Sequence, residues 1–511
     1  MYFSYDKLRQ SHSLTALLLV VLILLSGCGG SGAEEGTDEG ETGEVIESTV
    51  MEDQVEIDLP DIRERDTLRA ITSYSSTSYF LYKGQPMGYE YELLERLAEH
   101  LDMELQIVVA DNLNQVFSML HKGEGDLVAH GLTITKKRKQ RVDFTEHHTV
   151  TKQVLVQRKP ENWRKMKLHN IEKQLIRSPI KLIGEPVTVR RNSSYFTRLQ
   201  NLSEEIGGDI DIREAPGIET EELIKQVADG EIKYTVADQN IAAINKTYMP
   251  ELDIETAISF PQRIAWAVRK SSPQLKETLN EWIRSMRKQT DYYVIYNKYF
   301  KNQKAFATRA RSEFFSKKGG RISEYDDLFI NGADQVDWDW RLLAALSYQE
   351  SQFNPKTESW AGARGLLQVM PRTAKGYGIT DLFNPEESVK AGVAHIKALQ
   401  KHWEKIPDST ERMKFVIGSY NAGQYHVEDA RRLAEKYGAD PDVWNDNVAE
   451  YLLKKAQEEF YEDPVVKYGY CRGSEPYKYV KEILDRYAHY QKFIDRDLLD
   501  EDSQPKEAML R

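Results

Sequence analysis

The sequence has little cysteine, no long hydrophobic run and no excess of positive charge. Its two cysteines, Cys28 and Cys471, exclude a disulfide framework and a four-cysteine zinc site. The longest apolar run, residues 14–25, is too short for an ordinary spanning helix and excludes a multipass membrane protein. With 69 Lys and Arg against 81 Asp and Glu, the net charge of −12 argues against a broad nucleic-acid surface.

Motifs for metal and nucleophile chemistry are also missing. The sequence contains no HExxH motif, its 11 histidines are scattered, and no motif surrounds a candidate nucleophilic Ser or Cys. We therefore expect neither a metal site nor a cofactor. The composition that remains, with 40% hydrophobic and 29% charged residues over 511 positions, is typical of a soluble globular chain. Its length suggests roughly three to four domain-sized units.

The N-terminus has the layout of a secretory signal peptide. Two basic residues precede the apolar run at 14–25 and small residues follow it. The run ends in the letters LLSGC, which resemble the lipobox of bacterial lipoproteins. That resemblance implies that residues 1–27 are removed and that Cys28 carries the lipid anchor. In that family an Asp after the cysteine favours retention at the inner membrane, so the resemblance, with Gly29 at this position, implies the periplasmic face of the outer membrane. The alternative is an ordinary cleaved signal with a chance cysteine.

An acidic segment follows the predicted signal peptide. Residues 29–58 contain eleven Asp and Glu and no Lys or Arg, with Gly, Ser and Thr between them. Such a composition cannot bury a core, so residues 28–62 are predicted to form a disordered tether. The remaining chain is close to neutral, and the global acidity therefore does not indicate a cationic substrate.

From about residue 65 to residue 300, short apolar strands alternate with amphipathic helices. Strands are indicated at 68–71, 105–109, 126–129, 187–189 and 234–237, and helical stripes at 90–100 and 113–120. Strands separated by helices predict a parallel α/β sheet, and the recurrence of the pattern predicts two such lobes.

Three motifs in this region resemble the family-3 extracellular solute-binding proteins. They are residues 88–93 (GYEYEL), residues 132–138 (LTITKKR) with 142–145 (VDFT), and residues 264–270 (IAWAVRK). The resemblance implies a two-lobed periplasmic-binding-protein-like domain over residues 63–300. Lobe 1 would comprise 65–155 and 256–300, and lobe 2 would comprise 156–255.

The same resemblance implies a small-molecule site that takes an amino acid or a muropeptide. Arg138 presents a planar fork that suits a carboxylate, and Thr133 matches the hydroxyl that assists it. Asp238 matches the acid that pairs with an α-amino group, and Tyr74 is a candidate wall of the pocket. Gly131 replaces a serine common in transporter receptors, which leaves the ligand's identity open.

The pattern changes after a basic, irregular linker at 301–320. Residues 321–493 show helical spacing without convincing strands, which predicts a mainly α domain, and residues 494–511 form a polar tail. The fold class expected for the whole chain is therefore multidomain, with the two-lobed α/β domain followed by this all-α domain.

Glu350 is the candidate catalytic residue of the helical domain. Leu343, Leu346 and Glu350 are spaced i, i+3 and i+7, and Asn354-Pro355 ends the helix just beyond them. A glutamate at the end of a buried stripe loses solvation, which raises its pKa and suits it to general acid catalysis. Taken alone, such a residue more often reaches water or pairs with an arginine.

Four motifs that occur in order along the chain favour a catalytic role for Glu350. They are residues 350–355 (ESQFNP), 365–371 (GLLQVMP), 420–423 (YNAG) and 475–480 (EPYKYV). The series resembles the family-1 lytic transglycosylases, whose domain is similar to goose-type lysozyme. The resemblance covers about 321–493.

The resemblance implies cleavage of the β-1,4 bond between N-acetylmuramic acid and N-acetylglucosamine in peptidoglycan glycan strands. Glu350 would protonate the glycosidic oxygen and then deprotonate the C6 hydroxyl, which closes a 1,6-anhydro ring. Substrate contacts are implied for Ser351, Gln368, Tyr420, Asn421, Glu475 and Tyr479.

Two other functions stay open at this stage. A lysozyme-like hydrolase would use the same acid but admit water, and a non-catalytic envelope sensor would only bind glycan. Because one chain carries both modules, we also expect the receptor module to regulate or target the cleavage.

Overall fold

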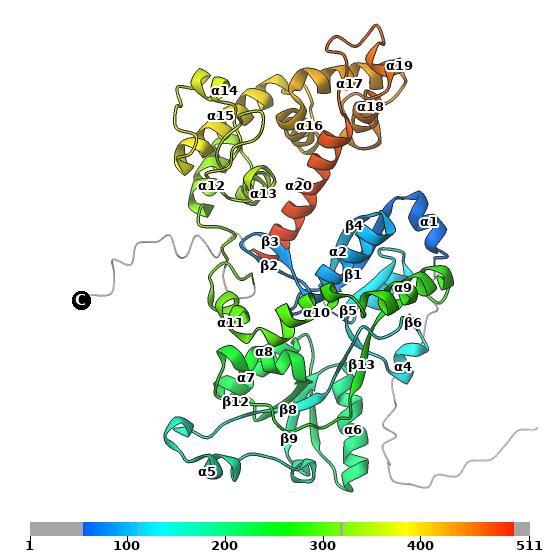
Figure 1. Ribbon diagram of the computed structural model, residues 1–511, viewed down its shortest axis with the longest axis vertical. Helices are drawn as coiled ribbons and strands as arrows, with labels where there is room; N and C mark the ends of the chain where they lie inside the picture. Colours follow the sequence, from blue (N-terminus) through cyan, green and yellow to red (C-terminus); the bar gives the residue numbers. More distant parts are fainter. Residues whose placement is uncertain (1–54, 112, 317–319, 495–511) are drawn as a thin grey trace, which may run out of the picture. The chain divides into compact units, whose positions relative to one another are not determined.

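The computed structural model describes residues 55–111, 113–316 and 320–494 (Figure 1). The predicted signal peptide, Cys28 and most of the predicted tether lie outside these residues. Among the described helices, none combines the length and the apolar character needed to cross a membrane.

Lobe 1 is built on a mixed sheet with the strand order β4-β1-β5-β13-β6, and β7 pairs with β13. Strand β1 is parallel to β4 and β5, whereas β13 is antiparallel to β5, β6 and β7. The strands are β1 (Thr67–Ser73), β4 (Glu104–Ala110), β5 (Leu127–Thr133), β6 (Asp143–Phe144), β7 (Thr149–Thr151) and β13 (Gln262–Val268). The predicted parallel pairing is therefore confirmed for β1, β4 and β5 but not for β13, which returns from lobe 2 and enters the sheet in the opposite direction.

Helices cover both faces of this sheet and give it two separate cores. They are α1 (Leu59–Glu64), α2 (Tyr89–Leu101), α3 (Val116–His121), α9 (Pro273–Met286) and α10 (Thr290–Tyr296). The short helix α4 (Lys136–Lys139) buries none of its residues. Helix α1 buries Leu59 and Ile62, and the Asp58 side chain caps its start. The folded region therefore begins before residue 63, where the sequence predicted a tether.

Lobe 2 has a second sheet with the order β10-β9-β11-β8-β12. Its strands are β8 (Gln153–Arg158), β9 (Pro186–Arg190), β10 (Asp211–Ala215), β11 (Tyr234–Asp238) and β12 (Leu252–Asp253). Helix α6 (Ser194–Ile206) packs on one face, and α7 (Thr220–Asp229) and α8 (Gln239–Tyr248) pack on the other (Figure 1). The short helix α5 (Leu168–Glu172) precedes β9. Two lobes with separate cores confirm the predicted α/β architecture.

The predicted linker is partly structured. It contains α11 (Gln303–Arg311), whose Phe306 and Ala310 form a small core with Ile244 of α8. A hairpin of β2 (Phe80–Tyr82) and β3 (Gln85–Met87) belongs to the same α/β region.

In the described part of the C-terminal region, helices joined by loops surround one core, and no strand beyond isolated bridges occurs. Its helices are α12 (Asp326–Ala333), α13 (Trp340–Ser351), α14 (Pro371–Gly376), α15 (Pro385–His402), α16 (Ser409–Ala422), α17 (Gln424–Lys436), α18 (Ala449–Lys454), α19 (Glu458–Tyr461) and α20 (Ser474–Phe493). Helix α13 lies at the centre of this core, where it contacts α12 and α20. The predicted α-domain is therefore confirmed.

Candidate active site and receptor cavity

Glu350 lies in the last turn of α13, on the face that packs into the helical core. The Asp339 side chain caps the start of the helix by accepting from the Arg341 amide at 2.9 Å. Leu343 and Leu346, earlier on the same face, are almost completely buried. The helix stops at Gln352, whose left-handed φ of 51° ends the hydrogen-bond ladder. These features leave Glu350 half-buried at the edge of the core.

Burial controls the protonation of Glu350. Loss of solvation raises the pKa of its carboxyl group to about 7, and a hydrogen bond donated by the Tyr479 hydroxyl lowers the pKa only in part. Tyr479 comes from α20 and is itself buried. A carboxyl group with this pKa is partly protonated at neutral pH, so it can give a proton and afterwards take one back.

Tyr420, at the end of α16, lies close to this carboxyl group. Its hydroxyl donates to the backbone oxygen of Leu367 at 2.7 Å. Burial raises the pKa of Tyr420 well above its ordinary value, and the negative charge of Glu350 raises it further. Asn421 follows on the same helix and is half-buried. The structure therefore brings Glu350 together with two tyrosines from two other helices.

Ser351 and Gln368 both hold the loop that carries Leu367. The Ser351 hydroxyl donates to the Leu366 oxygen at 2.9 Å, and the Gln368 amide donates to the oxygens of Thr357 and Gly365 at 2.9 Å each. The Ser351 bond joins α13 to residues 365–371, and the Gln368 bonds hold that segment to itself and to Thr357. Their predicted role as substrate contacts stays a prediction.

Gly365 and Gln368 give this loop its unusual backbone. Gly365 has a φ of 79°, and a Cβ atom there would lie 2.0 Å from the Leu382 oxygen, so only glycine fits. Gln368 has a φ of 45°, which is uncommon for a residue with a side chain. The loop is therefore held in a strained conformation beside the candidate acid.

Glu475 is placed differently from the other predicted residues. It is exposed in the first turn of α20. In the part of the chain that the structure describes, no contact links it to Glu350. Its assignment to the site remains a prediction.

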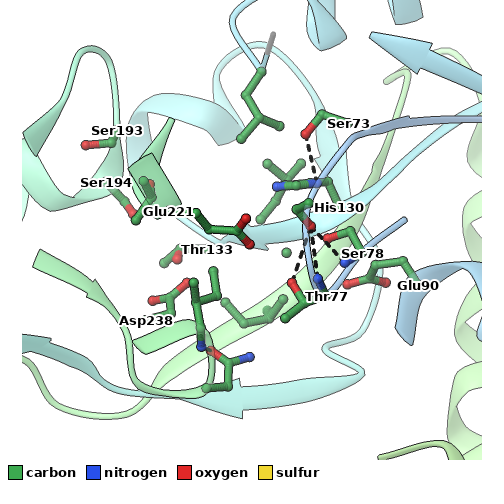
Figure 2. A pocket seen from close by; sticks show the side chains of 18 of the residues that line it. Ser73, Thr77, Ser78, Glu90, His130, Thr133, Ser193, Ser194, Glu221 and Asp238 are labelled. Carbon is green, nitrogen blue, oxygen red and sulfur yellow. Dashed lines mark hydrogen bonds between the residues drawn. The ribbon is translucent and has the colours of Figure 1, made fainter. Parts of the chain in front are cut away.

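The second site is a cavity of about 70 Å³ lined by residues of both lobes. Figure 2 shows polar side chains converging on one space, with Glu221 of lobe 2 extending between them. Ser76 of lobe 1 donates to Glu221 through its amide at 3.0 Å and its hydroxyl at 2.5 Å. These hydrogen bonds hold the two lobes together over the cavity.

All four predicted ligand residues line this cavity, namely Arg138, Thr133, Asp238 and Tyr74. The Arg138 guanidinium donates to the Thr133 oxygen at 2.9 Å, and burial lowers the pKa of Arg138 to about 10. Burial raises the pKa of Asp238 to about 7. One of its carboxyl oxygens is buried without a hydrogen-bond partner among the described residues. A guanidinium cation and a carboxyl group in one cavity suit a ligand that carries both a carboxylate and an ammonium group.

Sequence reasoning missed Arg190, which also lines the cavity. It is the last residue of β9, and parallel strands present ligand-binding groups at their carboxyl ends. That position, just before the start of α6 at Ser194, was the signal that could have found it.

Comparisons with known proteins match both predicted regions. The family of bacterial extracellular solute-binding proteins, family 3, matches residues 68–302, and the transglycosylase SLT domain matches residues 327–443. Among solved structures, an ancestral amino acid-binding protein, a precursor of cyclohexadienyl dehydratase, has 23% identity and a TM-score of 0.40. That alignment covers 47% of this chain and 98% of that one.

Curated relatives match across both regions together. A membrane-bound lytic murein transglycosylase F of Desulfosudis oleivorans is 34% identical over 426 residues, covering 83% of this chain and 90% of the relative. Proteins of the same name from Aliivibrio fischeri and Shewanella pealeana are 31% and 33% identical, covering 87% and 81% of this chain and 86% and 83% of the relatives. The chain therefore belongs to the membrane-bound lytic murein transglycosylase F family.

Proposed function

We propose that this protein is a peptidoglycan lytic transglycosylase that cleaves the β-1,4 bond between N-acetylmuramic acid and N-acetylglucosamine. The observation that carries the proposal is the half-buried Glu350, whose pKa of about 7 suits a general acid at neutral pH. The names of the curated relatives and the match to the transglycosylase SLT domain support the same activity.

One carboxyl group serves both proton transfers. Glu350 donates its proton to the glycosidic oxygen as the bond from that oxygen to the muramoyl C1 breaks. The resulting carboxylate takes the proton of the muramoyl C6 hydroxyl, and that oxygen bonds to C1 to form the 1,6-anhydro ring. Water is not consumed and a second carboxylate is not needed, in contrast to most glycosidases. In the described part of the chain, only burial and Tyr479 set the Glu350 pKa, which supports this scheme.

The surrounding residues position this acid and the substrate. Tyr479 stabilises the carboxylate that forms after the first proton transfer, because its hydroxyl donates to it. Ser351 and Gln368 hold the 365–371 loop beside the acid, and we assign Tyr420 and Asn421 to contacts with the sugar. Glu475 retains its assignment by family resemblance alone.

The receptor cavity is proposed to bind an amino acid or muropeptide and to regulate or target cleavage. Support comes from helix α20, which carries Tyr479 in its first half and Phe493 at its end. The Phe493 ring stacks on Tyr74 with the centroids 3.9 Å apart, and Tyr74 lines the cavity. His489 of α20 also bonds to the Tyr79 hydroxyl at 2.9 Å. A ligand would act by binding two states of this arrangement with different affinity.

We propose a location in the cell envelope, with lipid on Cys28 holding the protein at the periplasmic face of the outer membrane. The lipobox-like sequence and the membrane-bound relatives support this location. Metabolic labelling with a fatty acid and a Cys28→Ser variant test it. Labelled wild type with an unlabelled variant is expected, and equal labelling would contradict the anchor.

Digestion of purified sacculi tests the enzymatic proposal. The products of wild type, Glu350→Gln and the matched surface control Glu404→Gln are compared by mass spectrometry; Glu404 is exposed. Wild type and the control should release muropeptides with 1,6-anhydro ends, and Glu350→Gln should release none. Equal release by Glu350→Gln would exclude Glu350 as the acid, and hydrated reducing ends from wild type would indicate a hydrolase.

A further inference from the structure

Arg190 gives the receptor cavity a second guanidinium group. Its side chain is 10% exposed, and its Nε and Nη1 atoms are buried without a hydrogen-bond partner among the described residues. The acid that it contacts is Glu219, with Nη1 and Oε2 3.5 Å apart, and the Glu219 side chain is 42% exposed. This distance is too long for a good hydrogen bond, so the donors of Arg190 remain available.

Arg190 also lies near Arg138. The positive charge of Arg190 adds to the effect of burial in lowering the Arg138 pKa. Two like charges in one buried site are unfavourable unless anions lie between or beside them. A single α-carboxylate would satisfy one guanidinium and leave the other without a partner.

Apart from Glu219, whose contact with Arg190 is long, two further acidic side chains of the cavity are engaged elsewhere. Glu221 is engaged by the amide and hydroxyl of Ser76. Glu90 accepts from the Trp266 indole at 2.7 Å, and burial raises the pKa of Glu90 to about 7. Neither hydrogen-bonds to Arg190 in the described structure.

We propose that the cavity takes an amino acid, free or at the end of a peptide, that carries two carboxylates, with Arg138 binding one and Arg190 the other. Asp238, which has an unpartnered buried oxygen, accepts from the ammonium group of this ligand. The proposal rests on the receptor role stated under Proposed function and adds the charge of the ligand to it.

The charges and geometry favour this ligand over two others. A planar guanidinium fork matches a carboxylate through two parallel hydrogen bonds. A phosphate group has no ammonium group to donate to Asp238, whose buried oxygen has no partner among the described residues. A basic amino acid has no second carboxylate to offer to Arg190.

Isothermal titration of the full chain with glutamate and glutamine tests the proposal. The two amino acids have nearly the same shape and differ in the charge of the side chain, and both enantiomers of each are used. Wild type is expected to bind at least one glutamate enantiomer more than tenfold tighter than the matching glutamine, a difference of about 1.4 kcal/mol or more.

Three variants assign the effect to the cavity. Arg190→Gln should lose the preference for glutamate and keep the binding of glutamine, which also shows that the variant is folded. Arg138→Gln should bind neither glutamate nor glutamine. Arg191→Gln is the matched control, because the neighbouring side chain is 58% exposed and contacts Glu214 outside the cavity lining; it should behave as wild type.

The outcomes separate this inference from the receptor role. Equal binding of glutamate and glutamine by wild type, or an unchanged preference in Arg190→Gln, would overturn the second carboxylate and leave an amino-acid receptor intact. Failure of wild type to bind any of the four amino acids would overturn the inference, and a receptor for another amino acid or a muropeptide would remain.

Discussion

Replacing Tyr479 with phenylalanine removes the hydrogen bond that Glu350 receives from α20. The hydroxyl donates to the carboxylate form, so it stabilises that form and lowers the Glu350 pKa. Burial acts in the opposite direction and is the larger effect. Without the hydroxyl, burial acts unopposed and the Glu350 pKa rises above about 7.

The size of the shift follows from the energy of the lost bond. A hydrogen bond to a charged group contributes about 1.5–3 kcal/mol. Because one pKa unit corresponds to about 1.36 kcal/mol, the loss raises the Glu350 pKa by about 1–2 units. The acid then stays protonated to higher pH, but the carboxylate that forms in the reaction is less stable, so the maximal rate falls.

The assay is the pH dependence of kcat/KM on soluble glycan fragments, which reports the ionisation of the free enzyme. Wild type should lose activity as the pH rises through about 7. Tyr479→Phe should show a lower maximum and lose activity about 1–2 pH units higher. Tyr477→Phe, two residues earlier on α20 and half-buried, is the control and should follow the wild-type profile.

An unchanged alkaline limb in Tyr479→Phe would refute this reasoning. It would mean that Tyr479 does not interact with the ionised acid in the working enzyme. A limb that moves to lower pH would contradict the assigned direction of the hydrogen bond.

The remaining predictions concern stability and regulation. The Glu350 pKa is raised from 4.5 to about 7 in the fold, so its stabilising contribution is present below about 4.5 and is lost as the pH rises through 7. Urea denaturation at pH 8 should therefore find Glu350→Gln more stable than wild type by about 3 kcal/mol, and equal stability would contradict the shift. Asp429 is fully buried and accepts from Lys455 at 2.7 Å, so Asp429→Asn should lower the urea unfolding free energy by about 3–5 kcal/mol, whereas a loss below 1 kcal/mol would contradict the buried pair. Phe493→Ala removes the ring that stacks on Tyr74, and it should diminish the change in muropeptide release caused by adding glutamate. An undiminished change would show that the Phe493–Tyr74 contact does not couple the cavity to the active site.

Helices and strands whose buried residues recur at a regular spacing could be predicted from the sequence. The spacing of Leu343, Leu346 and Glu350 predicted a helix with a buried acid at its end, and α13 has this arrangement. The strands of both lobes were predicted for the same reason, because apolar runs bounded by helices indicate a covered sheet. The direction of β13 was not predicted, since strand pairing depends on the path of the chain between elements and not on composition.

Contacts between distant segments could not be predicted from periodicity. Tyr479 lies 129 positions from Glu350, and a buried stripe on each helix does not specify which side chains meet. The role of Ser351 and Gln368 as sugar contacts stays a prediction, and their hydrogen bonds to backbone oxygens were not foreseen. Ser351 donates to the Leu366 oxygen, and Gln368 donates to the oxygens of Thr357 and Gly365. Arg190 was missed because a charged residue at the end of a strand more often faces solvent.

Digestion of sacculi by wild type in water enriched in 18O, followed by mass spectrometry of the new glycan ends, tests the central claim most directly. If the C6 hydroxyl, deprotonated by Glu350, bonds to C1, the new ends are 1,6-anhydro rings that contain no 18O. Reducing ends that carry one 18O atom would show that water enters the reaction, and they would contradict the proposed transglycosylase mechanism.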